Sequence, residues 1–213
     1  MNIPPEYTKL QCGSFRLENP TSIDYTNQYW GNDLQKSSIE EQCYNVNGYR
    51  NARGETKSFS VLRHCVGRSI LEIGCSPGEF MKVASGAGFE CCGIDPCKGD
   101  FDFVSKRSCG TIVNGFFPHI QLPVEEFDTI VAMDVIEHVD DPETFVRSAM
   151  DLLTYRGRLI LMMPALYDDG LFDEKNFCSE HINIFSQKKL RSWLKPILFD
   201  RWMVGHEIVV IEK

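Results

Sequence analysis

The feature that most constrains the fold is the run ILEIGCSPGEF at residues 70–80. An apolar segment ends at Ile73, the chain turns between Gly74 and Gly78, and an amphipathic segment follows. This order is typical of a buried strand, a tight turn and the start of a helix. In an open α/β sheet such a junction is where a nucleotide binds, although strand–turn–helix units also occur without any ligand.

The glycine spacing of this turn restricts which nucleotide it suits. The motif Gly-x-Gly-x-x-Gly is typical of sites that bind nicotinamide dinucleotides. Here Gly74 and Gly78 are separated by Cys-Ser-Pro, and Glu79 stands at the position of the last glycine of the motif. Glu72 and Glu79 place negative charge on both sides of the turn, which opposes a pyrophosphate at the helix N-terminus. A cationic sulfonium nucleotide that carries no phosphate fits the turn better.

Two later segments continue the pattern. Residues 88–96, GFECCGIDP, contain a short apolar strand that closes on Asp95. Asp95 follows the turn by about twenty residues, the separation at which a βαβ unit brings a carboxylate to a ribose diol. The alternative for Asp95 is an acid in a surface turn before a proline. Residues 127–133, FDTIVAM, form another apolar strand, and the polar run DVIEH at residues 134–138 follows it directly.

Together these segments resemble the class I S-adenosylmethionine-dependent methyltransferases, and most closely the small-molecule group that includes the ubiquinone-biosynthesis O-methyltransferases and sugar methyltransferases. The resemblance covers residues 58–213. It implies an enzyme whose cofactor is S-adenosyl-L-methionine. The chain departs from the common Gly-Cys-Gly-x-Gly turn because Ser76 and Pro77 occupy it, which makes the turn stiffer than usual.

The resemblance also implies which residues bind the cofactor. The turn borders the methionine moiety, with Glu72 at its amino end, and Asp95 takes the ribose hydroxyls. Asn114 stands where the family often has an acid for the adenine amine, and Phe116 after it either packs on the adenine ring or belongs to the core. The cofactor-binding residues predicted in this way are Glu72, Gly74, Cys75, Ser76, Gly78, Asp95, Pro96, Asn114 and Asp134.

Two histidines are candidates for catalysis. Methyl transfer from a sulfonium releases a neutral thioether, so the protein has to align donor and acceptor and accept the proton of the acceptor. By the resemblance, His138 and His181 compete for the role of general base, and each is alternatively an imidazole bonded to the backbone. The remaining histidines, His64, His119 and His206, have no predicted partner.

A metal is not part of the predicted site. In ubiquinone-type relatives an acid-x-x-Glu-His segment is associated with a divalent metal, and Asp134, Glu137 and His138 offer two carboxylates and an imidazole. Many relatives that share the Glu-His pair use no metal. The sequence therefore leaves metal use open.

Composition limits the class of protein. The 213 residues are 43% hydrophobic, which suits one α/β domain, and no apolar run approaches the roughly eighteen residues that span a bilayer. A net charge of −8 argues against nucleic acid as the substrate. Residues 1–10 show no secretory leader and the nine cysteines contain no Cys-x-x-Cys pair, so we expect reduced thiols in the cytoplasm.

The predicted fold is a doubly wound, Rossmann-like α/β sheet of seven strands, mostly parallel with an antiparallel C-terminal hairpin. Residues 58–213 form the S-adenosylmethionine-binding domain, and residues 1–57 form a small N-terminal cap over the substrate. The expected strands are 69–73, 90–95, 110–113, 128–133, 158–163, 198–204 and 207–212, and the expected helices are 58–66, 77–87, 141–157 and 186–193.

The predicted function is methyl transfer to a hydroxyl of a small molecule, such as a sugar, a nucleotide-sugar or a phenol. The long loop within residues 164–186 is expected to line the acceptor pocket, with Tyr167 orienting the substrate. A catalytically silent methyltransferase-fold partner or scaffold protein is the alternative, and an RNA ribose or cap methyltransferase is a third. The oligomeric state leaves no signal in the sequence.

Overall fold

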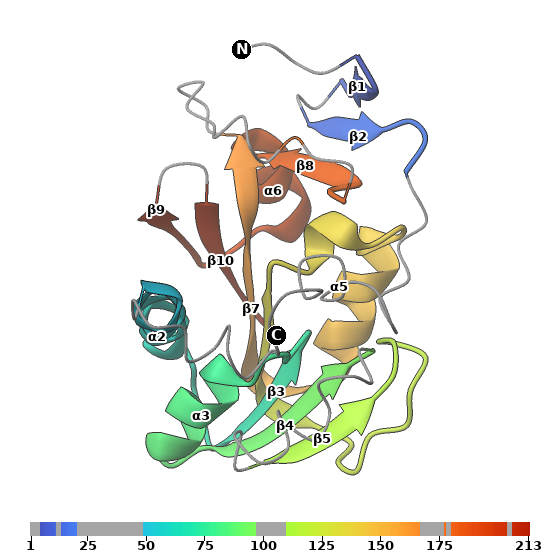
Figure 1. The fold of residues 1–213 in the computed structure, drawn as a ribbon. Coiled ribbons are helices and arrows are strands. Elements are labelled where there is room, and N and C mark those ends of the chain that lie inside the picture. Colours follow the sequence, from blue (N-terminus) through green and yellow to red (C-terminus); the bar gives the residue numbers. More distant parts are fainter. Residues whose placement is uncertain are drawn as a thin grey trace.

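The computed structural model describes residues 5–11, 14–20, 49–96, 110–166, 177, 180–203 and 206–213, with the backbone alone at residues 49–55 and 201–203 (Figure 1). These residues form one mixed β-sheet with helices packed on both of its faces. Within them, no helix combines the length and the apolar character needed to pass through a bilayer.

Ten strands make up the sheet in the described residues. Their order runs β5-β4-β3-β6-β7 with all pairs parallel, and β10 and then β9 follow as antiparallel neighbours of β7. The far end of β7 pairs with β8, which leads on to β2 and β1. The strands are β1 Tyr7–Lys9, β2 Phe15–Leu17, β3 Ser69–Ile73, β4 Glu90–Asp95, β5 Thr111–Asn114, β6 Phe127–Met133, β7 Leu153–Leu166, β8 Asn183–Ser186, β9 Leu198–Met203 and β10 His206–Glu212.

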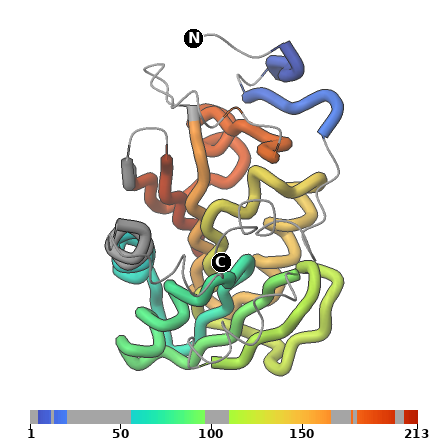
Figure 2. Tube along the Cα trace, in the orientation of Figure 1, coloured from blue at the N-terminus to red at the C-terminus, as the bar shows by residue number. Residues whose placement is uncertain are grey.

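This sheet confirms the predicted α/β class, the parallel centre and the antiparallel C-terminal hairpin, whereas the count of seven strands is exceeded. The additional strands are β1, β2 and β8, and Figure 2 shows the first two beside the third although they lie far apart in the sequence. The part of the predicted N-terminal cap that is described thus continues the sheet. The tight turn expected at Gly205 lies outside the described residues.

Four α-helices are described: α2 Tyr49–Leu62, α3 Glu79–Gly86, α5 Pro142–Asp151 and α6 Gln187–Leu194. α2 begins nine residues before the predicted start, so the domain boundary drawn at residue 57 falls inside a helix. The predicted caps of the last two helices are present. The Asp141 side chain accepts a hydrogen bond from the Thr144 amide at 3.0 Å, and the Ser186 hydroxyl accepts one from the Lys189 amide at 3.2 Å.

The core lies in two layers, one on each face of the sheet. Along β7, Leu159 and Leu161 point into the layer that α5 and α6 cover, while Ile160 and Met162 point into the layer that α2 and α3 cover. All four side chains are fully buried. This two-sided burial explains why the central strands read as continuous apolar runs, and it leaves the ends of the strands as the place for polar chemistry.

Candidate functional site

The turn after β3 is fastened to the neighbouring strand β4. The amides of Gly74 and Cys75 both donate to the carbonyl of Ile94, at 2.8 and 3.1 Å. Gly74 has a φ of 77°, and a Cβ at this position would lie 2.5 Å from Cγ2 of Val135, which follows β6. Only glycine therefore fits, both for its backbone angle and for the close approach of the next segment.

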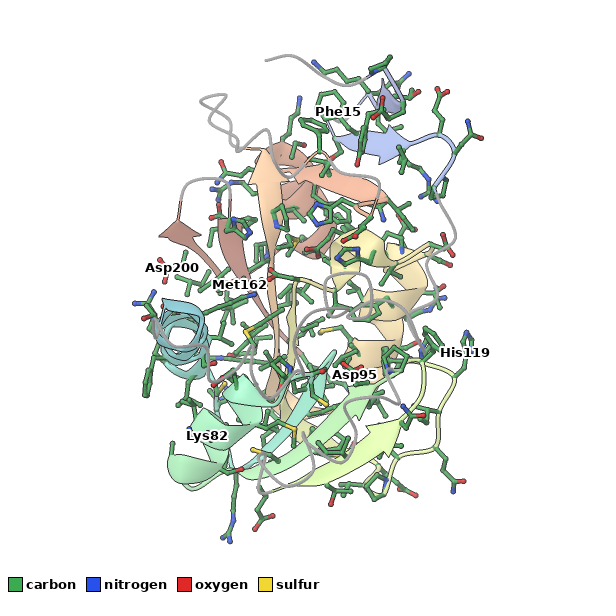
Figure 3. The ribbon with its side chains drawn as sticks, in the orientation of Figure 1. Phe15, Lys82, Asp95, His119, Met162 and Asp200 are labelled. Carbon is green, nitrogen blue, oxygen red and sulfur yellow. The ribbon has the colours of Figure 1, made fainter. Side chains whose placement is uncertain are left out.

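Asp95 links this turn to the ends of two strands. Its Oδ2 accepts a hydrogen bond from the Ser76 amide at 3.0 Å, and its backbone carbonyl accepts one from Nδ2 of Asn114 at 2.9 Å. Figure 3 labels Asp95 at the end of β4, where it is half-buried. The structure thus brings together the residues predicted for the methionine and ribose parts of the cofactor. Cys75 differs from the others because its thiol is buried against Met81 under the turn, which leaves its backbone alone to face a ligand.

Glu72 is a buried carboxyl group at the same edge, with an exposed fraction of 3%. Burial raises its pKa well above the usual value, and the nearby Asp95 adds to this effect, while Lys57 and the Met81 amide oppose it. Its Oε2 has no hydrogen-bond partner in the described part of the chain. A buried acid with an unused oxygen is complementary to an ammonium group such as that of a methionine moiety, so Glu72 fits S-adenosylmethionine.

Asp134 begins the second half of the site. Its backbone has a φ of 54°, and its amide donates to the Met162 carbonyl at 2.8 Å. Its Oδ2 forms an ion pair with Nζ of Lys57 from α2. Although burial favours a raised pKa, the ion pair and the nearby His206 and His138 lower the pKa of Asp134.

Two histidines and a glutamate meet next to Asp134. Glu137 and His138 belong to the single turn η2, Ile136–His138, and His181 precedes β8. The rings of His138 and His181 have centroids 4.9 Å apart at an interplanar angle of 70°. Both predicted catalytic residues are therefore in contact although 42 residues separate them in the chain. The Tyr7 hydroxyl donates to the His181 carbonyl at 2.6 Å, which ties β1 to this cluster.

The environment moves the pKa values of the two neighbours in η2 in opposite directions. Glu137 is fully buried, and burial together with Asp134 raises its pKa to about 8, against the opposing effect of His181. Burial and His181 lower the pKa of His138 to about 4. Its Nδ1 lies 2.7 Å from the Glu180 carbonyl, so the neutral ring donates from Nδ1 and presents an unprotonated Nε2.

These three residues also form the arrangement best suited to a metal ion. Glu137, His138 and His181 each offer one ligand atom, and these atoms lie within 4.8 Å of one another. One oxygen and two imidazole nitrogens suit a divalent transition metal. This set differs from the Asp134–Glu137–His138 combination suggested by the sequence. Asp134 forms an ion pair with Lys57, and His181 is the third possible ligand in its place.

Several other residues differ from expectation. His206 lies near enough to Asp134 to affect its pKa, and Nε2 of His64 lies 3.3 Å from Oδ2 of Asp200, so these two histidines do have partners. Phe116 is 49% exposed, whereas Phe117 packs edge-on against Phe145 at 5.3 Å. Residues 167–176, which include Tyr167 and most of the predicted acceptor loop, lie outside the described part.

Lys57 is a site residue that no sequence pattern indicates. It sits within a polar stretch of α2 that carries no motif, and its partner Asp134 is 77 residues away. No spacing rule connects the two. The available signal was the pair of acids at the ends of β3 and β6, Glu72 and Asp134, since a buried carboxylate favours a cation nearby.

A turn bounded by two glycines, an acid at the end of the next strand and a cluster of titratable groups lie at one edge of a mostly parallel sheet, an arrangement that suits a nucleotide-binding α/β protein. A family model described as "Methyltransferase domain" matches residues 47–197. The chain belongs to this family, which confirms the resemblance to the S-adenosylmethionine-dependent methyltransferases and its cofactor.

Individual relatives agree with this family. The chain is 31% identical over 107 residues to the mitochondrial ubiquinone biosynthesis O-methyltransferase of Schizosaccharomyces pombe, covering 46% of this chain and 39% of that protein. It is 29% identical over 163 residues to the tRNA U34 carboxymethyltransferase of Vibrio vulnificus, covering 70% and 50%. The chain thus spans about half or less of the length of these relatives.

Solved structures show the same fold. A crystal structure of a Thermotoga maritima protein, described as an S-adenosylmethionine-dependent methyltransferase and possible histamine N-methyltransferase, aligns with a TM-score of 0.56 at 20% identity. The alignment covers 82% of this chain and 98% of that one. It supports the methyltransferase-like α/β architecture.

Replacing Gly74 with alanine is expected to weaken binding of S-adenosylhomocysteine by about tenfold or more, because the left-handed backbone costs about 1–2 kcal/mol and the new methyl group meets Val135. Isothermal titration calorimetry measures the effect. Gly86→Ala is the matched control, since nothing lies within 4 Å of a Cβ there and the helix should become slightly more stable. Adding Val135→Ala should restore part of the lost affinity; no loss in Gly74→Ala itself would contradict the assignment.

Glu137 makes stability depend on pH in a defined direction. The folded protein keeps the Glu137 proton up to about pH 8, whereas the unfolded chain releases it near pH 4.5, so stability declines as the pH rises between these values. Between pH 6 and 9 the unfolding free energy should fall by about 2–3 kcal/mol more in the wild type than in Glu137→Gln. Urea unfolding at both pH values tests this, with the exposed Glu126→Gln as the control, and parallel declines in wild type and Glu137→Gln would disprove it.

Proposed function

We propose that this chain transfers a methyl group from S-adenosylmethionine to a hydroxyl group of a small molecule. The observation that carries the proposal is the contact between His138 and His181 beside the glycine turn. A hydroxyl acceptor has to lose a proton during transfer, and this pair supplies basic nitrogens at the same sheet edge as the predicted cofactor residues. The first relative named above is an O-methyltransferase of a small molecule, which agrees with this acceptor class.

In this mechanism each residue of the chain has a separate task. Glu72 accepts hydrogen bonds from the ammonium group of the methionine moiety, and Asp95 accepts them from the ribose hydroxyls. The amides of the turn are held by Ile94, so the backbone facing the ligand is already ordered before binding. When bound, S-adenosylmethionine supplies an electrophilic methyl group whose leaving group is neutral.

His181 is the better general base of the two histidines. The lowered pKa of His138 keeps its ring neutral at physiological pH, but it also makes the ring a weak proton acceptor. The bond between His138 Nδ1 and the Glu180 carbonyl holds the residue just before His181. His138 therefore positions the segment that carries His181, and His181 takes the acceptor proton.

A divalent cation would be held by Glu137, His138 and His181. It would lower the pKa of a hydroxyl bound to it and so promote loss of the proton without a base. In that case Glu137 has to be ionised, and the charge of the cation would offset the burial and the Asp134 charge that raise its pKa. Activity that survives treatment with a chelator would favour His181 acting as the base.

The acceptor that we propose is a sugar, a nucleotide-sugar or a phenol-like compound. The test is transfer of a radiolabelled methyl group from S-adenosylmethionine to a panel of these compounds, with total tRNA included because one relative modifies tRNA. Labelling of a hydroxyl in the small compounds is the expected outcome. Labelling of tRNA alone would show that the acceptor is RNA and not a small molecule. Binding of S-adenosylhomocysteine without any methyl transfer would favour a catalytically silent partner or scaffold protein.

Separate alanine variants distinguish the two histidines. His181→Ala should lower kcat by about 10²–10⁴-fold because the base is lost. His138→Ala should lower kcat less, because it removes only the hydrogen bond to Glu180 that positions His181. Steady-state kinetics with the acceptor found above measures both, and the exposed His119→Ala serves as a remote control (Figure 3). A larger loss in His138→Ala would reverse the assignment, and unchanged turnover in both would remove the base from the mechanism.

A further inference from the structure

Tyr7 connects the N-terminal strands to the proposed base. Its hydroxyl donates to the backbone carbonyl of His181 at 2.6 Å, across a separation of 174 residues in the chain. The tyrosine is buried, with an exposed fraction of 6%, and its ring packs edge-on against Phe177 at a centroid distance of 5.0 Å. Packing holds the ring and the hydrogen bond holds its polar end, so the position of this side chain is well defined.

The backbone on both sides of His181 is hydrogen-bonded. The peptide group between Glu180 and His181 has its carbonyl bonded to Nδ1 of His138 at 2.7 Å. The next peptide group, between His181 and Ile182, has its carbonyl bonded to Tyr7. Because each peptide group is planar, restraining both groups restrains the direction of the Cα–Cβ bond between them. The imidazole then turns only about its two side-chain torsions, and the contact with the His138 ring limits these as well.

The hairpin formed by β1 and β2 has a hydrophobic cluster of its own. β2 pairs with β8, where Phe15 is opposite Ile184, and the Leu17 amide donates to the carbonyl of Ile182 at 2.9 Å. Figure 1 shows the hairpin at this end of β8. Three buried side chains of the hairpin pack with Ile184 in a cluster separate from the two main core layers: Tyr7, Phe15 and Leu17. The support for Tyr7 therefore does not depend on a single contact.

A second residue of the hairpin reaches the segment that follows the other histidine. Arg16 donates from Nη2 to the carbonyl of Asp140 at 3.3 Å and from Nη1 to Oδ1 of Asn183 at 3.4 Å. Asn183 donates in turn from Nδ2 to the carbonyl of Val139 at 2.8 Å. Val139 and Asp140 directly follow His138 in the chain. The hairpin is thus bonded to the segments that carry both histidines.

We propose that Tyr7 is a positioning residue for methyl transfer, because its hydrogen bond orients His181 toward the hydroxyl group of the acceptor. This inference rests on the proposed function, in which His181 takes the proton, and it adds the β1–β2 hairpin to the residues that support the reaction. The hairpin lies outside residues 47–197, which the family model matches. Proton transfer requires the two heavy atoms to be about 2.6–3.2 Å apart, so a small rotation of the imidazole slows it.

The first test is Tyr7→Phe, which removes the hydroxyl and keeps the packed ring. The kcat of methyl transfer should fall by about 5- to 20-fold, while the affinity for S-adenosylhomocysteine, measured by isothermal titration calorimetry, should stay the same. Tyr155→Phe is the matched control and should change neither value, since Tyr155 is 85% exposed at the start of β7, whose other end pairs with β8. An unchanged kcat in Tyr7→Phe would overturn the proposal.

A double-variant cycle separates positioning of the base from a purely structural role. If Tyr7 acts through His181, Tyr7→Phe should lower kcat in the wild type and have little further effect in the His181→Ala background. Equal losses in both backgrounds, with a lowered melting temperature, would show that the tyrosine only stabilises the fold.

Nuclear magnetic resonance provides a readout that does not require activity. In Tyr7→Phe the imidazole nitrogen signals of His181, assigned by their loss in His181→Ala, should shift, whereas those of the exposed His119 should not. Unshifted His181 signals would contradict the positioning role. Absence of methyl transfer by the wild type would instead reject the proposed function, and the spectra would then decide alone whether Tyr7 orients His181.

Discussion

The close approach of Gly74 to Val135 determines how the rest of the site is arranged. A Cβ on residue 74 would lie 2.5 Å from the Val135 side chain. The turn after β3 and the segment after β6 are therefore so close that no methyl group fits between them. The same turn is tied to Ile94 by two amides and to Asp95 by a third. Three parallel strands thus position one surface, and residues from distant parts of the chain meet there without a flexible connection.

Buried carboxyl groups give this surface its chemical character. Glu72 and Glu137 are both buried, and Oε2 of Glu72 and both carboxyl oxygens of Glu137 have no hydrogen-bond partner among the described residues. Leaving such groups unpaired costs free energy, and proteins tolerate that cost mainly at functional sites. The environment separates the pKa values of Glu137 and His138 in opposite directions, so that the acid is protonated and the imidazole is neutral near pH 7. This pattern is typical of residues that handle protons.

Functional residues could be predicted from the sequence where they lie at the end of a predicted strand. Glu72, Gly74 and Asp95 were predictable because strand, turn and acid follow one another at a fixed spacing. β8 carries no strand signal in the sequence, since its four residues are all buried and show no alternation, and its last residue, Ser186, also fits a helix cap. The start of α2 carries no sequence signal because residues 49–55 are mostly polar and show no apolar periodicity.

Contacts between distant residues were the harder part. The sequence marks His138 and His181 as candidates, but nothing in their spacing indicates that their rings touch or that Lys57 pairs with Asp134. Those facts depend on how α2 and β8 pack against the end of β6, which is a property of the tertiary structure. The same packing explains why His181 replaces Asp134 in the group that could bind a metal.

The excess of acids also bears on how the reaction is completed. In the proposed complex the sulfonium carries a positive charge that Asp95 and Asp134 attract, whereas the thioether left after methyl transfer is neutral. The field of these acids acts on one form and not on the other, and partial burial strengthens it relative to water. A site of this kind holds the methyl donor more tightly than the demethylated product on electrostatic grounds alone. Lys57 limits the effect, because its ion pair with Asp134 offsets part of the negative charge.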